Sequence, residues 1–319
     1  MKSWKRKIQN TILIFFKSIF IIIFMTVFSV KAKEVINTKY LFSFNSHKSS
    51  CILRVNNFPA IDTSNAEQGT MSAGFNLTAF LENGANDIEL LMGPQDHKDP
   101  NTLFADSSCQ VIISKETENT STEIANFTLS VNNQGKITAD GSTNYTRAVS
   151  SGIFNTEIRE NYTKDEKDHG LYKLRSNIIL RDLPRWSWVN ATPVTEHDLL
   201  KIRKAYTDIW LMMKERDIEG LKQITRISNQ EMAFAEGATT GMIFISSDFP
   251  QHVIDKQLTP LPIEWNKYKL ITYRGGRLFR LGVGYFQNSP LRFIDAYGDI
   301  AFAYNPYFSI IDGKVTLVR

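Results

Sequence analysis

Asp295 and Tyr297 are the residues of this chain whose types and spacing come nearest to a catalytic pair. They are two positions apart, so on a β-strand their side chains would share one face. A carboxylate and a phenol on one face can act as a general base and a hydrogen-bond donor. The alternative, which we favour, is a surface pair beside a turn at Gly298. We therefore predict no catalytic residues and keep this pair as candidates for a cavity.

Metal and cofactor chemistry have little support in the sequence. The five histidines are scattered, and His197, which lies beside a carboxylate, is better explained as a solvated residue at a helix start. Neither cysteine has a histidine at metal-ligand spacing. The chain has no Gly-x-Ser-x-Gly motif, phosphate loop or dinucleotide-binding motif. Arg274 to Arg277 (RGGR) is interpreted as a hairpin turn, because no helix follows it. We expect neither metal nor cofactor.

The two cysteines, Cys51 and Cys109, each open a strand-like run, CILRV and CQVII. In an exported protein an even pair of this kind predicts one disulfide. Closing a loop of this size would stabilise the fold by about 4 kcal/mol in the chain-entropy model. Two buried free thiols are the alternative.

Residues 1–32 have the pattern of a signal peptide. A basic start is followed by the apolar run Ile19 to Val30, and Ala32 provides a small residue at the cleavage position. We expect cleavage after Ala32 and a periplasmic or secreted protein. The alternative is an uncleaved anchor over residues 11–30, which would hold the protein at the inner membrane facing the periplasm.

The charge pattern argues against nucleic acid as a partner. The net charge is +4, but residues 1–32 carry six basic residues and no acid, so removing them leaves about −2. Phosphate binding needs a basic face rather than a basic leader. Residues 33–150 are acidic, with eight bases and thirteen acids.

Residues 33–183 consist of short strand-like runs separated by turns, which favours a β-sandwich. In Phe75 to Met92 (FNLTAFLENGANDIELLM) a short strand leads to a turn at Gly84 and Asn86, and a second strand starts at Ile88. This segment, with LRVNNFPAID upstream, resembles the jelly-roll, galactose-binding-like modules of glycoside hydrolases. The resemblance implies their topology. Carbohydrate or cell-wall binding is kept as an alternative function.

Residues 184–194 are interpreted as a linker, with the sequence PRWSWVNATPV. Trp186 and Trp188 alternate beside Pro184, so one or both could pack the two domains together. Ligand stacking by these indoles is the less favoured alternative.

Residues 195–319 read as helices followed by strands. Thr195 and Asp198 predict a capping box for a helix to Arg216, whose apolar residues lie on one face. After this helix we predict a shorter helix over residues 217–227 and a third helix capped by Ser228 and Glu231. We then predict a buried strand over residues 242–245 and a brief helix at Pro250. From Tyr268 onward the turns predict an antiparallel meander.

This order of elements resembles the NTF2-like cone fold, in which a curved sheet wraps a helix. The resemblance implies an α+β domain of a kind found among isomerases and dehydratases, transport adaptors and bacterial immunity proteins. A cone-fold enzyme would use Asp295 and Tyr297 in its cavity.

The function that these features favour is that of a periplasmic, non-catalytic protein-binding protein. Its most concrete version is an immunity or inhibitor protein that neutralises a toxin, with a toxin or envelope protein as partner. The C-terminal part is rich in aromatic residues, which are enriched at protein interfaces. The interface candidates are Trp186, Trp188, Tyr285, Tyr297, Tyr304 and Tyr307.

Overall fold

Alternation of apolar and polar residues shapes the N-terminal half of the chain. In the computed structural model, which describes residues 38–146 and 156–319, β1 (Thr38–His47) buries Tyr40, Phe42 and Phe44 on one face. Successive side chains of a strand point to opposite faces, so this pattern gives a sheet with one buried side. The signal peptide proposed for residues 1–32 lies outside the described residues.

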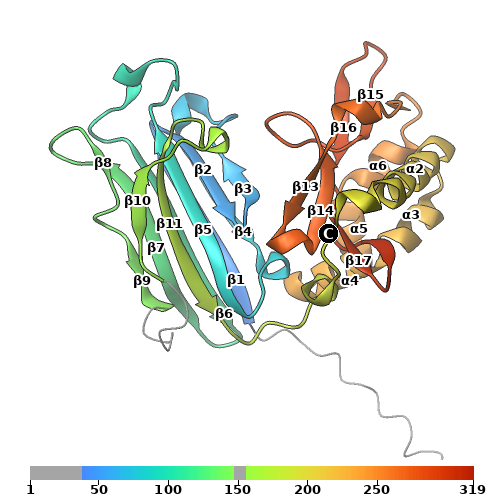
Figure 1. Ribbon diagram of the computed structural model, residues 1–319, viewed down its shortest axis with the longest axis horizontal. Helices are drawn as coiled ribbons and strands as arrows, with labels where there is room; N and C mark the ends of the chain where they lie inside the picture. The colour runs from blue at the N-terminus through green and yellow to red at the C-terminus, as the bar shows by residue number, and fades with distance from the viewer. Residues whose placement is uncertain (1–37, 147–155) are drawn as a thin grey trace, which may run out of the picture. The chain divides into compact units, whose positions relative to one another are not determined.

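Two antiparallel sheets make up this half (Figure 1). The β1 sheet has the strand order β4-β1-β6-β7-β8, with β9 paired to β7, and the β5 sheet has the order β10-β11-β5-β2-β3. Their inward faces share one hydrophobic core, to which Phe42, Leu53, Leu90 and Phe127 belong. This arrangement is compatible with the expected β-sandwich. The strand bounds are β2 Ser50–Val55, β3 Phe58–Asp62, β4 Met71–Asn76, β5 Gly84–Gly93, β6 Ser108–Thr117, β7 Ser121–Val131, β8 Ile137–Thr138, β9 Thr143–Asn144, β10 Arg159–Tyr162 and β11 Tyr172–Leu180.

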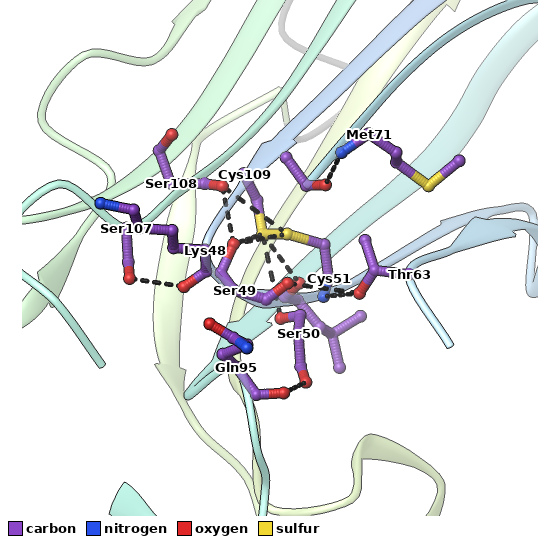
Figure 2. The surroundings of a disulfide bond; sticks show 12 residues. Lys48, Ser49, Ser50, Cys51, Thr63, Met71, Gln95, Ser107, Ser108 and Cys109 are labelled. Carbon is purple, nitrogen blue, oxygen red and sulfur yellow. Dashed lines mark hydrogen bonds between the residues drawn. A yellow bond between two sulfur atoms is a disulfide. The ribbon is translucent and has the colours of Figure 1, made fainter. Parts of the chain in front are cut away.

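The predicted disulfide between Cys51 and Cys109 is confirmed, and it joins the two sheets. Cys51 lies on β2 and Cys109 on β6, with Cα atoms 6.0 Å apart and both side chains buried. Figure 2 shows Ser49 beside the bond, where its hydroxyl donates to the carbonyl of Ser108 over 2.7 Å. The disulfide therefore crosses the core beside a hydroxyl group and a backbone carbonyl that are hydrogen-bonded to each other.

The chain passes from one sheet to the other through a corner segment, residues 77–83, between β4 and β5. Gly84 has φ of 98°, and the buried Asn86 holds the turn. The amide nitrogen of Asn86 donates to the carbonyls of Glu82 and Gly84, while its oxygen accepts from Asn56 and from the Glu82 amide. The turn at Gly84 and Asn86 is as predicted. Strand β5 begins at Gly84, earlier than the expected Ile88.

The long helix of the C-terminal half is α2 (Leu199–Glu215), and a 3₁₀ turn at Glu196–Asp198 precedes it. The predicted capping box of Thr195 and Asp198 is present. Ile202, Tyr206, Ile209 and Met213 are buried. Their spacing of three and four residues places them on one face, which is the reason this helix packs as predicted.

Four shorter helices lie with α2 in the C-terminal half (Figure 1): α3 (Ile218–Ile224), α4 (Arg226–Glu236), α5 (Thr240–Ser246) and α6 (Phe249–Ile254). The brief helix expected at Pro250 is α6. Among the described residues, no helix has both the length and the apolar character needed to cross a bilayer.

Two predictions in this stretch are wrong. Ser228 does not cap a helix, because Thr225 already occupies the N-cap position of α4 and Ser228 lies buried inside it. The segment over residues 242–245 is helical rather than a buried strand. The Thr239 hydroxyl accepts from the Met242 amide and starts α5, and the side chains of Met242 and Ile245 are about three-fifths exposed. A short apolar run has too few residues to show its period.

The C-terminal strands are divided between two antiparallel sheets, so the prediction of one continuous meander is wrong. One sheet has the order β12-β15-β16 and the other β13-β14-β17-β18. Strand β14 pairs with β17 rather than with β15, although β15 follows it in sequence. Leu281, Phe293 and Phe308, from β14, β15 and β17, pack in one core with α2. The strand bounds are β12 Thr259–Pro260, β13 Lys269–Tyr273, β14 Leu278–Gly282, β15 Leu291–Ile294, β16 Ile300–Tyr304, β17 Phe308–Ile311 and β18 Lys314–Leu317.

The described chain is thus built of antiparallel sheets in its first half and of helices with antiparallel sheets in its second. This agrees with the predicted mixed β and α+β class. The finer jelly-roll and NTF2-like assignments remain predictions, as do the domain limits 33–183, 184–194 and 195–319.

Candidate functional site

The two linker tryptophans lie inside the molecule. Trp186 and Trp188 are 3% and 0% exposed. The indole of Trp186 donates to the carbonyl of Leu81 over 2.9 Å, and that of Trp188 donates to the carbonyl of Ala79 over 3.2 Å. Each indole thereby satisfies a carbonyl of the corner segment, while its ring joins a cluster with Phe58.

Ion pairs hold the same corner segment against the C-terminal half. Glu82 accepts from Arg277 in a bidentate pair at 2.8 and 2.6 Å and also contacts Arg274. Glu231, interpreted from the sequence as a helix-capping acid, instead pairs with Arg319 at 2.5 Å. That interpretation is wrong because α4 begins too early for it. The RGGR turn therefore serves as a contact between the halves.

Asp295 and Tyr297 do not share a strand face, because β15 ends at Ile294. The Asp295 carboxylate accepts from the backbone amides of Tyr297 and Asp299, over 2.9 and 3.0 Å, and so closes the turn. The side chain of Tyr297 is 92% exposed. The pair consequently lies in an open turn.

The remaining aromatic candidates divide between core and surface. Tyr304 stacks on Phe249 with ring centroids 3.9 Å apart, and burial raises the pKa of its hydroxyl. Tyr307 packs edge-on against Phe58. Tyr285, in contrast, is 48% exposed in the loop after β14. Of the six aromatic interface candidates, Tyr285 and Tyr297 therefore present exposed rings.

Tyr285 borders a groove along β2 and β3, formed by two adjoining hollows of about 490 and 480 Å³. We call this the β2–β3 groove. Both hollows are lined by Ile52, Asp62, His169 and Tyr285. The first also includes Ser50, Thr63 and Gln95, which Figure 2 shows around the disulfide. The second continues to Arg280, Phe286, Gln287 and Tyr307.

His169 lies at one wall of the groove and was not selected from the sequence. It follows a 3₁₀ turn (Glu166–Asp168) and adopts φ of 53°, and its ring centroid is 5.0 Å from that of Tyr285. The preceding residue, Asp168, anchors this turn beneath the surface. Proximity between His169 and Tyr285 depends on tertiary packing, so local sequence gave no signal for it.

Asp168 is fully buried within a compact charged cluster. Its carboxylate accepts from Arg54 and Lys173, each over 2.6 Å, and from Thr163. Burial acts to raise the pKa of this carboxyl, but the hydrogen bonds from Lys173, Thr163 and Arg54 outweigh it and lower the pKa to about 2. Glu89 lies 3.4 Å from Arg54 and 3.5 Å from Lys173. Two cations and two anions therefore balance one another, and one of them, Arg54, lines the groove.

No family model matches this chain, and neither does a curated protein or a solved structure.

The groove offers contact surface rather than a reactive set. Tyr285 and Phe286 expose about half of their side chains, and their rings meet edge to face at 5.0 Å. Asp62 accepts from the amide and hydroxyl of Ser64, which makes it part of a local turn. Among the described residues there is no group of histidine, cysteine and carboxylate side chains placed to bind a metal. The groove presents the two exposed aromatic rings together with charged side chains such as Arg54, Lys167 and Arg280.

Proposed function

We propose that this protein is an exported, non-catalytic protein-binding protein and that the β2–β3 groove receives a segment of its partner. The observation that carries the proposal is the exposed pair Tyr285 and Phe286 at the rim of the groove. Aromatic residues are enriched at protein interfaces and their hot spots, so two adjacent exposed aromatic rings beside a hollow favour a binding surface.

The most concrete version is an immunity or inhibitor protein that neutralises a toxin. Export through residues 1–32, the disulfide and the resemblance of the C-terminal half to NTF2-like immunity domains support this version. The jelly-roll resemblance of the first half would then supply a scaffold for the groove. The open position of Asp295 and Tyr297 gives no support to the alternative of a cone-fold enzyme.

Co-purification from the envelope fraction of the source cells tests the proposal. The full chain is compared with a Tyr285→Ala, Phe286→Ala double variant and with Tyr297→Ala, whose ring is exposed away from the groove. The partner identified by mass spectrometry is then purified and titrated by calorimetry. We expect the double variant to bind at least about 30-fold more weakly, since losing a hot spot costs about 2 kcal/mol.

The control variant Tyr297→Ala is expected to bind like the unchanged protein. Equal affinity of the double variant and the unchanged protein would contradict the placement of the site. Specific retention on a polysaccharide or peptidoglycan resin, lost in the double variant, would replace protein binding by the carbohydrate alternative.

A further inference from the structure

Arg280 is a buried cation without an acidic partner. It lies on β14, between β13 and β17, and is 4% exposed. The other buried cationic side chains of the described chain, Arg54, Lys173 and Arg319, each form an ion pair with a carboxylate. Arg280 forms none within the described residues. A buried charge without a counter-charge is costly.

The contacts of Arg280 satisfy only part of its guanidinium group. Nη2 donates to the Phe286 carbonyl over 3.3 Å and lies 3.5 Å from the side-chain oxygen of Gln287. The group also lies over the ring of Tyr307, 4.8 Å from its centroid. The Nε atom is buried without a partner, and the hydroxyl of Tyr273 is a further neutral neighbour of the guanidinium group. Neutral oxygens and a ring face thus surround a full positive charge.

Arg280 lines the second hollow of the β2–β3 groove, and its neighbours there suit an anion with an apolar body. Lys167 and His169 also line this hollow, whereas Asp62, the acid of this hollow, is held in the turn with Ser64. Apolar surface comes from Pro59, Ile61, Phe286 and Tyr307. A volume of about 480 Å³ is enough for a large side chain or a short chain end.

We propose that the hollow at Arg280 is a carboxylate-binding site. A guanidinium group matches a carboxylate better than any other anion-binding side chain, because its planar fork can donate two parallel hydrogen bonds. The incoming carboxylate would supply the counter-charge that Arg280 lacks. That this carboxylate is an acidic side chain or a chain terminus of the protein partner rests on the proposed function, whereas the site itself does not.

The test uses phenylacetate, a carboxylate with an aromatic body, and phenylacetamide, its neutral analogue, on the full chain. We expect phenylacetate to raise the thermal unfolding midpoint and to bind at least tenfold more tightly than phenylacetamide. Arg280→Gln should lose this preference. Arg292→Gln should keep it, because Arg292 lies on β15 against Tyr268, outside the groove.

If Arg280→Gln fails to fold, carboxylate binding is tested with Arg280→Lys and by comparing the two ligands on the unchanged protein. Lysine keeps the charge without the fork and should retain a weaker preference for phenylacetate. Equal effects of phenylacetate and phenylacetamide on the unchanged protein would overturn the site, as would full binding by Arg280→Gln.

Partner binding separates this inference from the proposed function. If the purified partner binds Arg280→Gln as tightly as the unchanged chain, the proposed function stands and the carboxylate does not come from that partner. If phenylacetate binds as expected and no protein partner exists, the site stands for a free carboxylate and the proposed function fails.

Discussion

Asp168 shows how single residues of this protein keep charge beneath the surface. Its carboxylate has three donors from two strands and a loop, and none of its surface is exposed. Arg54 and Lys173, which donate two of these bonds, are themselves almost fully buried. Removing one member of such a cluster leaves another uncompensated, so each residue matters more than an exposed ion pair would.

Replacement of Asp168 by asparagine is expected to weaken the acid sensitivity of folding. The folded pKa of about 2 lies below the ordinary value of 3.8, so this group stabilises the fold above pH 4 and loses that contribution as pH falls from about 4 to about 2. The loss amounts to about 2 kcal/mol. Urea unfolding of Asp168→Asn between pH 6 and pH 2 should show a correspondingly shallower decline.

The control is Asp208→Asn, which removes an exposed ion pair with Lys204 on α2. This variant should retain the pH dependence of the unchanged protein. If the stability of Asp168→Asn declined with pH as steeply as that of the unchanged protein, the cluster would not lower the pKa of the Asp168 carboxyl in the folded state.

At the scale of elements, the joins between strands decide where the groove forms. The disulfide ties β2 of the β5 sheet to β6 of the β1 sheet, and β2 also lines the groove through Ile52 and Arg54. The corner segment carries the chain between the sheets and receives Trp186 and Trp188. Strand β2 therefore belongs both to the disulfide-linked core and to the lining of the groove.

Loss of the disulfide should destabilise the protein without changing its fold. A Cys51→Ala, Cys109→Ala double variant is expected to unfold with about 4 kcal/mol less free energy, because the unfolded chain regains the freedom of a long loop. Urea unfolding followed by circular dichroism measures the difference. Adding a reductant should lower the stability of the unchanged protein and leave the double variant unaffected. Equal stability of the two proteins would contradict this account.

At the scale of the whole molecule, the described residues, 38–146 and 156–319, belong to one compact unit. Contacts between the described halves combine the aromatic cluster of Phe58 and Tyr273 with the ion pairs of Glu82. Large apolar contacts of this kind resist relative domain motion more than polar ones. The second hollow of the groove, which both halves line, is consequently part of this packed arrangement.

The proposed export of the molecule gives a direct prediction for its N-terminus. If residues 1–32 are a signal peptide, the protein isolated from the source cells should begin at Lys33. N-terminal sequencing or intact mass measurement distinguishes this product from the full chain. A protein that keeps residues 1–32 and sediments with the membrane fraction would instead support the retained anchor.

The sequence by itself determined the elements whose signals are local. Residues spaced by three and four positions predicted α2, and Thr195 with Asp198 predicted its start, because helix periodicity and capping involve neighbours in the chain. The cysteine pair predicted the disulfide by number and context. Arg280 also left a signal that was missed, since it is a lone charge within the buried strand LFRLG.

Only the tertiary structure decided how distant segments meet. The pairing of β14 with β17 and the approach of His169 to Tyr285 depend on long-range packing, which local patterns do not encode. The same holds for the open turn of Asp295 and Tyr297, because where β15 ends depends on its partner strands. The pattern of apolar residues along a chain predicts which side chains are buried, whereas a binding groove arises from surfaces that folding brings together.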